Sequence, residues 1–257
     1  MAGSIPNRVD GQSRRSIGYV AVMAEALVGR DAVLAATDTH PYALLTTGGG
    51  EGVTGVRDGS TVVWITHGSV VCALGDGVVA AATAARLAAE RQSDGPRWWH
   101  LPRLAGQTPV AVRVRDEWDF RWTRQAPPVR VGEERAVRVD DEAGIGALLD
   151  IAFPGTTTRP GDPRVRAWWT IRDGDRVLAC AADRSRGGVG FLSAIAVHPD
   201  ARGQGLGAAL TAALTRALVG EYGIAALGVM SDNLVANRMY ESLGYGSSTP
   251  RTSVGLA

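Results

Sequence analysis

The spacing of hydrophobic residues changes once within residues 189–219, and this change predicts a strand, a turn and a helix. Residues 189–197 form a nearly continuous apolar run, which is typical of a buried strand. Over residues 206–218, apolar residues recur every three or four positions, which predicts an amphipathic helix. The turn between them contains Gly203, Gly205 and Gly207. This stretch is the most clearly patterned part of the chain.

The helix that starts after this glycine-rich turn leaves its first amide groups without intrahelical acceptors. Aligned peptide dipoles add about half a positive charge at the same end, so an anion is the natural ligand. The glycines carry no side chains that would hold a phosphate away, and they tolerate unusual backbone angles. We therefore expect an anion-binding loop directly before residue 206.

The first half of the chain alternates between strand and helix patterns. Helical spacing covers residues 19–28 and 78–90. Short apolar runs predict strands at residues 42–45, 61–66, 69–74, 98–101, 110–114 and 119–122.

Pro127 and Pro128 disfavour a regular helix or strand at this point, because each fixes its own backbone angle and removes a hydrogen-bond donor. We place a domain boundary there, with one domain at residues 1–128 and a second at 129–257. In the second domain, one helix is predicted to follow a cap at Asp140 or Asp141 and to run through Ile145, Leu148, Leu149 and Ile151. A second helix is predicted at residues 206–218, and a third is predicted to follow a cap at Ser231 or Asp232 and to end at Leu243. Strands are predicted at residues 134–139, 165–172, 176–182, 189–197, 224–230 and 247–254, the second and third joined by an Asp-Gly hairpin turn. The fold class is therefore mixed α/β.

Composition narrows the class of protein. A chain of 257 residues is long enough for two domains, and its net charge of +1 argues against nucleic-acid binding. Cys72 and Cys180 lie far apart in apolar runs, as buried thiols in a reducing compartment do. The four histidines lack ligand spacing, so no metal site is expected. Charges interrupt the apolar residues 17–36, so we expect a cytoplasmic protein without a membrane partner.

Two motifs in the second half carry a family resemblance. Residues 197–207 read Val-His-Pro-Asp-Ala-Arg-Gly-Gln-Gly-Leu-Gly, and they contain the pattern Arg/Gln-x-x-Gly-x-Gly/Ala. The second pattern is Asn-x-x-Ala-x-x-x-Tyr-x-x-x-Gly-Phe/Tyr, matched by Asn233, Ala236, Tyr240, Gly244 and Tyr245. In this order, with a strand between them, the motifs resemble those of the GNAT acetyltransferase family. The resemblance covers roughly residues 133–257 and implies a GNAT fold there.

The resemblance implies an N-acetyltransferase that moves an acetyl group from acetyl-CoA to a primary amine by direct attack in a ternary complex. In the family, the loop amides hold the pyrophosphate, the preceding strand pairs with the pantetheine arm, and an Asn from the end of the next strand reaches the cofactor. The corresponding residues here are Ile195, Ala196, Val197, Arg202, Gly203, Gln204, Gly205, Leu206, Gly207, Ala208 and Asn233. Tyr240 corresponds to the residue that protonates the leaving thiolate.

The general base stays open at this point. Some family members carry a Glu on the central strand, where this chain has Phe191 and Ser193. A water relay, a distant carboxylate such as Asp150, or delivery of an already neutral amine are the alternatives. We expect His198, in the lead-in to the loop, to have a role in a surface turn.

The first half repeats the strand-turn-helix order around Gly75, Asp76 and Gly77, but it lacks the Arg or Gln that starts the family's loop. Our hypothesis is that residues 1–128 form a smaller, divergent GNAT-like domain that no longer binds cofactor and shapes the acceptor site. This tandem layout is similar to that of mycothiol synthase.

Two other functions are compatible with the sequence. An acyl-CoA-binding regulatory module without turnover would explain the missing Glu. A dinucleotide-binding protein would explain the Gly-x-Gly-x-x-Ala pattern that starts at Gly203 and again at Gly75. For the acetyltransferase, we expect a small-molecule or peptide amine as the acceptor and a monomer or homodimer as the assembly.

Overall fold

The computed structural model describes residues 24–49, 52–66, 70–90 and 97–257. Its strands form one twelve-stranded sheet in the order β1-β2-β3-β4-β5-β12-β6-β11-β10-β9-β8-β7. The strands are β1 (Glu25–Val28), β2 (Thr54–Asp58), β3 (Thr61–Thr66), β4 (Val70–Leu74), β5 (Trp98–Pro102), β6 (Val112–Thr123), β7 (Val137–Val139), β8 (Ala167–Asp173), β9 (Arg176–Asp183), β10 (Gly190–Val197), β11 (Ala225–Met230) and β12 (Ser247–Leu256). The helices are α1 (Arg30–Ala36), α2 (Pro41–Thr46), α3 (Gly77–Glu90), α4 (Ile145–Ala152), α5 (Leu206–Tyr222) and α6 (Leu234–Ser242), with short 3-10 turns η2 (Glu133–Arg135) and η3 (Pro199–Ala201). The mixed α/β class is confirmed.

The sheet consists of two structural repeats. Read from its two ends, the order is β1-β2-β3-β4-β5 on one side and β7-β8-β9-β10-β11 on the other. In each repeat the third and fourth strands are antiparallel, while the fourth and fifth are parallel and joined through a long helix, α3 or α5. The chain passes from the first repeat to the second between β6 and η2, in the segment that contains Pro127 and Pro128.

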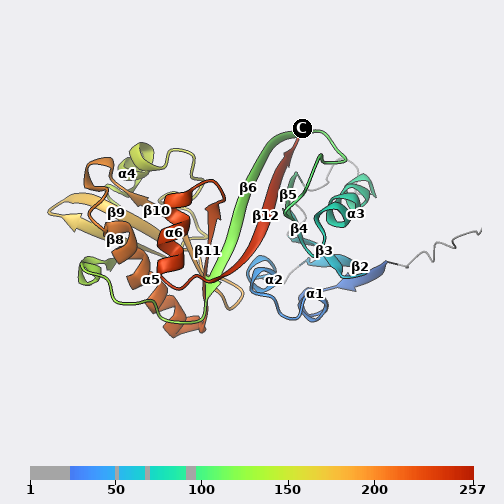
Figure 1. Cartoon of the computed structure of the whole chain (residues 1–257), viewed down its shortest axis with the longest axis horizontal. Coiled ribbons are helices and arrows are strands. Elements are labelled where there is room, and N and C mark those ends of the chain that lie inside the picture. The colour runs from blue at the N-terminus through green and yellow to red at the C-terminus, as the bar shows by residue number, and fades with distance from the viewer. Residues whose placement is uncertain (1–23, 50–51, 67–69, 91–96) are drawn as a thin grey trace, which may run out of the picture.

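The two repeats exchange their last strands at the centre of the sheet. The last strand of the first repeat, β6, pairs with β11, and the last strand of the second, β12, pairs with β5. The two exchanged strands also pair with each other along their lengths, from Trp122 opposite Ser247 to Val112 opposite Leu256. They cross the middle of the molecule between the two lobes (Figure 1). Neither lobe therefore completes its sheet without the other half of the chain.

Four apolar clusters hold the helices on the sheet. Helix α5 covers residues of β8 to β11, and α4 packs on the opposite face through Leu148 and Leu149. In the other lobe, α3 packs against β3, β4 and β5, while α1 and α2 pack on the other face. The cluster under α1 and α2 continues into β6, β10 and β11 through Phe120, Phe191 and Ala226. The two lobes thus share one of their cores.

Most elements that the periodicity predicts are confirmed, including the strand, turn and helix of residues 189–219. The predicted caps are wrong, because Gly144 and Asn233 are the N-cap residues of α4 and α6, and the start of the strand predicted at residues 134–139 lies in η2. Three predicted elements are also wrong. Residues 42–45 lie in helix α2, because Pro41 starts the helix and the His40 Nδ1 accepts the Tyr42 amide at 3.1 Å. Apolar runs this short do not distinguish strand from helix. Of the predicted helix at residues 19–28, the part up to residue 23 lies outside the described residues, and Glu25–Val28 is strand β1.

The third wrong prediction concerns the pair of strands at residues 110–114 and 119–122. They belong to the single strand β6, which includes the charged residues between them. Charged residues separate the two apolar runs, and Glu117 among them forms ion pairs with Arg103 at 2.7 Å and with Arg115 at 3.1 Å. Tertiary pairing thus overrides local polarity.

Arg251 attaches β12 to the first lobe, and its loss should destabilise the whole chain. Its side chain is fully buried, donates to the carbonyl oxygens of Ala73 and His100 at 2.8 and 2.5 Å, and lies 3.9 Å from the centre of the Tyr42 ring. We predict that Arg251→Met lowers the free energy of unfolding by about 2–4 kcal/mol, because two buried carbonyls lose a charged donor. Urea denaturation measures this value.

The matched control is Arg86→Met on the exposed face of α3. It should change the free energy of unfolding by no more than about 0.5 kcal/mol. Equal stability of Arg251→Met and the unsubstituted protein would contradict the role assigned to Arg251.

Candidate functional site

Strands β10 and β11 separate partway along their length. They pair from Gly190 opposite Ala225 to Leu192 opposite Leu227, after which β11 continues beside β6 as far as Met230. Beyond Leu192, β10 keeps its pairing only with β9, across a bulge in which Ala194 has a positive φ of 49°. Among the described residues, no strand pairs with the other edge of β10 from Ser193 to Val197. Backbone groups of Ile195 and Val197 therefore face an open wedge.

The wedge leads to the start of helix α5, whose first amides are not capped. Gly205 is the N-cap residue, with a φ of 78°, and no side chain accepts a hydrogen bond from the first turn. Gly203 has a φ of 77°, and an added Cβ at either glycine would meet no atom within 4 Å. Gly207 differs, because its added Cβ would lie 3.3 Å from the Val197 side chain. The first two glycines thus leave the loop open, and the third allows close packing.

The equivalent helix of the first lobe is capped by its own chain. The Asp76 carboxylate accepts hydrogen bonds from the amides of Val78 and Val79 at 2.8 and 2.9 Å. A Cβ at Gly77 would lie 2.5 Å from the Arg103 carbonyl oxygen, so this turn is packed against backbone. An external phosphate would have to displace a carboxylate already held by these amides. The two repeats share a topology but differ at this anion site.

A cavity of about 490 Å³ occupies the wedge. Strands β10 and β11, helix α6 and the loop at residues 153–158 form most of its wall, and β5, β6 and β12 close its far end. Its lining residues are His100, Trp118, Phe153, Gly155, Thr156, Thr157, Thr158, Arg184, Phe191, Leu192, Ser193, Ala194, Ile195, Gly228, Val229, Met230, Asn233, Ala236, Tyr240 and Ser253. None of these is a carboxylate, so among the described lining residues the only formal charge is the guanidinium of Arg184.

Tyr240 and Asn233 reach the cavity from α6. Tyr240 is 6% exposed, and burial raises the pKa of its phenol to about 12. Within the described part of the chain its hydroxyl has no hydrogen-bond partner, whereas the neighbouring Tyr245 hydroxyl bonds to Thr215 at 2.7 Å. Asn233 caps α6 by accepting the Ala236 amide at 3.1 Å. Tyr245 thus has a structural partner, and Tyr240 is available to a ligand.

The structure brings together some of the other candidate residues and separates the rest. Phe191 and Ser193 both line the cavity. They occupy the central-strand positions at which the sequence has no Glu. Asp150 lies outside it, in an exposed ion pair with Arg159 at 2.6 Å. His198 accepts the Asp200 amide at 3.2 Å and caps the turn η3, as expected for a surface turn.

The sequence reasoning missed a polar cluster at the far end of the cavity. The Trp118 indole donates to the Ser253 hydroxyl at 2.7 Å, and His100 Nδ1 lies 2.6 Å from the same oxygen. Burial, with a smaller effect of Arg251, lowers the pKa of His100 to about 4, so its imidazole is neutral at pH 7. These residues come from β5, β6 and β12, so no sequence spacing could have indicated the cluster.

No group of three or more His, Cys, Asp or Glu side chains in the described ranges has a geometry suited to a metal ion. No helix among the described residues combines the length and the apolar character that a membrane span requires.

Comparison with known proteins identifies the class of this domain. Residues 146–245 match the model of the acetyltransferase (GNAT) family. The matched segment contains the splayed strands, the glycine loop and α6. The chain therefore contains a GNAT acetyltransferase domain, an acyltransferase class, and the resemblance inferred from the two motifs is confirmed. No curated protein matches the sequence significantly.

Solved structures share the fold over more than this segment. A protein assigned to the GNAT family from Novosphingobium aromaticivorans is 22% identical, with a TM-score of 0.53 over 72% of this chain and 84% of that chain. A GCN5-related N-acetyltransferase from Kribbella flavida is 21% identical, with a TM-score of 0.50 over 78% and 88%. A GNAT-family acetyltransferase from Colwellia psychrerythraea is 8% identical, with a TM-score of 0.51 over 91% and 99%. The last alignment extends the shared fold to most of both lobes.

The neutral state of His100 predicts a specific pH dependence of stability. The unfolded imidazole has a pKa of about 6.5, so as pH falls from 6.5 to 4 the unfolded chain binds a proton first and stability falls. We predict that His100→Gln removes about 2–3 kcal/mol of this fall between pH 7 and pH 4.5. Urea denaturation at both pH values, with NMR titration of the ring, measures the effect. An unchanged slope, or a ring pKa near 6.5, would contradict the buried cluster.

Proposed function

We propose that this protein is an acetyl-CoA-dependent N-acetyltransferase that transfers an acetyl group to a primary amine by direct attack in a ternary complex. The observation that carries the proposal is the uncapped start of α5 beside the open edge of β10, which together lead into the cavity that contains Tyr240. An anion site, an unpaired strand edge and the buried phenol of Tyr240 follow one another along this path. This arrangement suits a long ligand that carries a phosphate at one end and a reactive group at the other.

The residues of this path fit acetyl-CoA. Amides of residues 202–208 would hold the pyrophosphate, because the loop is exposed and unobstructed above Gly203 and Gly205. Backbone groups of residues 195–197 would pair with the amide-containing pantetheine arm as an added strand. Asn233, which lines the cavity, would contact the same arm. When bound, acetyl-CoA supplies an acyl group already activated as a thioester.

The cavity favours a neutral amine. An alkyl amine in water has a pKa of about 10.4, and both desolvation and a nearby cation lower that value. The described lining residues offer Arg184 and no carboxylate, so an ammonium ion would gain no ion-pair partner among them. Of the three alternatives for the base, this environment supports delivery of an already neutral amine. Asp150 is held outside by Arg159.

As the C–N bond forms and the C–S bond breaks, Tyr240 would protonate the departing thiolate, and the proton that the amine nitrogen loses on becoming an amide would restore the phenol. A thiol has a pKa of about 8.5, so the thiolate is a moderate leaving group that benefits from a donor. Because burial raises the Tyr240 pKa to about 12, the phenol keeps its proton throughout the working pH range. The hydroxyl is not engaged elsewhere in the described part of the chain.

We also propose that residues 1–128 are a divergent domain of the same family that binds no cofactor and shapes the acceptor site. The repeated topology supports the common origin, and the Asp76 cap supports the loss of phosphate binding. His100 and Trp118 of this part wall the cavity. The acceptor is a small-molecule or peptide amine. The free, buried Cys72 and Cys180 suit the cytoplasm.

Substitution of Gly205 tests the cofactor site. We predict that Gly205→Glu abolishes acetyl-CoA binding in a calorimetric titration, because it places a carboxylate where the pyrophosphate would sit. The fold should persist, since a non-glycine residue at this positive φ costs about 1 kcal/mol. Gly205→Gln separates charge from bulk and should retain more affinity than Gly205→Glu.

The matched control in the first lobe is Asp76→Ala. It should cost about 1 kcal/mol of stability through loss of the α3 cap and leave acetyl-CoA affinity unchanged. Retained binding by Gly205→Glu would refute the assigned site, and a large loss in Asp76→Ala would refute a silent first domain.

Tyr240→Phe tests the proton donor. We predict a kcat at least about 100-fold lower, with little change in acetyl-CoA affinity. The control is Tyr245→Phe, which removes the hydroxyl bonded to Thr215 and should affect stability rather than kcat. In the unsubstituted enzyme, the rate should rise with pH as the amine loses its proton. It should not fall again below pH 10, because Tyr240 is protonated below its pKa of about 12.

Steady-state measurement of thiol release from acetyl-CoA with a panel of amines provides these values. Equal kcat for Tyr240→Phe and the unsubstituted enzyme would assign the donor elsewhere. Acetyl-CoA binding without turnover of any amine would instead support the regulatory module.

A further inference from the structure

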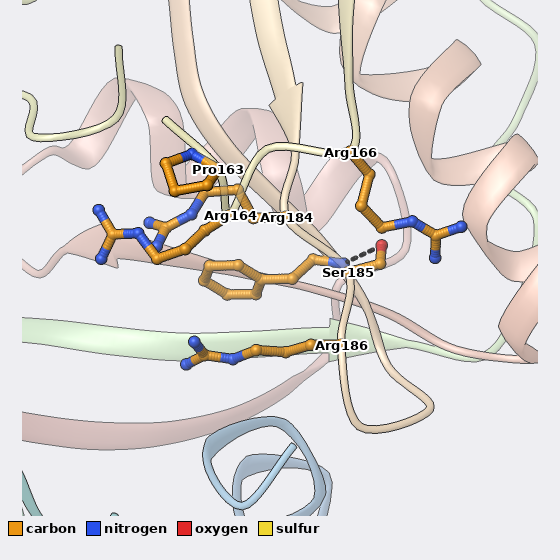
Figure 2. A pocket seen from close by; sticks show the side chains of 7 residues that line it. Pro163, Arg164, Arg166, Arg184, Ser185 and Arg186 are labelled. Carbon is orange, nitrogen blue, oxygen red and sulfur yellow. Dashed lines mark hydrogen bonds between the residues drawn. The ribbon is translucent and has the colours of Figure 1, made fainter. Parts of the chain in front are cut away.

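A second cavity of about 270 Å³ adjoins the first and is lined mainly by arginines. Its walls are the segment before β8 and the segment between β9 and β10, and its lining residues are Pro163, Arg164, Arg166, Arg184, Ser185, Arg186 and Phe191. The side chains of Arg164, Arg184 and Arg186 point to the same side of the pocket, whereas Arg166 points the opposite way (Figure 2). Three guanidinium groups thus gather in one part of the pocket.

Two of the four arginines that line the pocket have no carboxylate partner in the described part of the chain. Arg184 donates to the Thr158 hydroxyl at 3.0 Å, and its buried Nε has no hydrogen-bond acceptor. Arg186, exposed at the pocket, donates to the Leu45 carbonyl oxygen at 3.0 Å.

The other two arginines are neutralised. Arg164 forms a two-point pair with Asp162 at 2.8 and 2.9 Å, and Arg166 pairs with Glu221 at 3.2 Å. The excess positive charge therefore belongs to Arg184 and Arg186.

The excess charge is held at an energetic cost. Burial, followed by repulsion from Arg164, lowers the pKa of Arg184 below its ordinary value. Nearby carboxylates do not fill the gap, because Asp183 accepts hydrogen bonds from the amide and hydroxyl of Ser185, and Asp162 is occupied by Arg164. A cationic pocket with an unsatisfied buried donor is suited to an external anion, since guanidinium groups bind carboxylate and phosphate through paired hydrogen bonds.

The arginine pocket lies beside the larger cavity that contains Tyr240, which is called the reaction cavity below. Arg184 and Phe191 line both cavities. Thr158, which accepts the Arg184 hydrogen bond, also lies 3.1 Å from the Ser193 hydroxyl on the splayed part of β10. A molecule in the reaction cavity can therefore extend from the open edge of β10 to the guanidinium of Arg184.

We propose that Arg184 and Arg186 bind an anionic group of the acceptor, so that the substrate is an amine that also carries a carboxylate or a phosphate. This inference rests on the proposed N-acetyltransferase activity and names the acceptor class of the same site. The anion binds between the two arginines, and the amine lies in the adjoining cavity near Tyr240. Neutralisation of Arg184 by the acceptor's anion also makes binding selective for molecules that carry both groups.

The test compares matched acceptors that differ in charge. The carboxylate series is glycine, β-alanine, 4-aminobutyrate and 5-aminovalerate, each against its carboxamide, and the phosphate pair is O-phosphoethanolamine against ethanolamine. Thiol release from acetyl-CoA gives kcat/KM for each. We expect at least one acid to exceed its neutral partner by about 10- to 100-fold, mainly through KM. The series with the larger ratio distinguishes a carboxylate from a phosphate.

Substitution then assigns the effect to the pocket. Arg184→Gln and Arg186→Gln should each lower the acid-to-neutral ratio by about tenfold or more. Arg138→Gln, at an exposed position on β7, is the matched control and should keep the ratio. A ratio near one in the unsubstituted enzyme, or a ratio unchanged by both pocket variants, would overturn the inference.

Binding measurements keep the inference testable without turnover. The N-acetyl derivatives of the same acids, and their amides, are titrated calorimetrically into the unsubstituted enzyme and both pocket variants. Acid-selective binding that is lost in the variants supports the anion site even if no amine is acetylated. Absence of acid-selective binding and of acid-selective turnover overturns it. Failure of the proposed function is a separate result, because it is measured as absent acetyl-CoA binding or absent thiol release.

Discussion

The antiparallel pairing of β6 and β12 at the centre of the sheet is the interaction on which the rest of the structure depends. Each strand belongs by sequence to one repeat and completes the sheet of the other, so backbone hydrogen bonds link the two lobes along the full length of both strands. The same pair supplies Trp118 and Ser253 to the far wall of the reaction cavity. Lobe assembly and cavity assembly are consequently one event, and the site requires both halves of the chain.

The two repeats share one topology but differ in whether the first amides of the long helix are free to bind an anion. A few residues at the start of each helix account for this difference. In the first lobe a carboxylate of the chain caps the long helix and the turn packs against backbone. In the second lobe the glycines at the same place leave the helix dipole and its amides exposed, and the adjoining strand edge is unpaired beyond Leu192. Helix geometry creates the potential for anion binding, and the local side chains decide whether it is used.

The electrostatics of the two cavities are mutually consistent. The reaction cavity has no carboxylate among its described lining residues and shares Arg184 with the arginine pocket. This charge distribution disfavours an ammonium ion and favours an anion nearby. In the proposed acceptor, Arg184 attracts the acid group, while desolvation in a cavity without a described carboxylate favours the neutral form of the amine. Tyr240, with its raised pKa, completes the arrangement as a neutral donor.

The sequence by itself determined the elements whose signals are local. The period of residues 206–218, the glycines before them and the motif that contains Tyr240 identified the α5 loop and the family, because helix periodicity and turn chemistry act within a few residues. Tertiary structure alone decided that β6 is one central strand and that His100, Trp118 and Ser253 meet. These outcomes depend on pairing between residues more than a hundred positions apart, where local polarity and spacing carry no information about the partner.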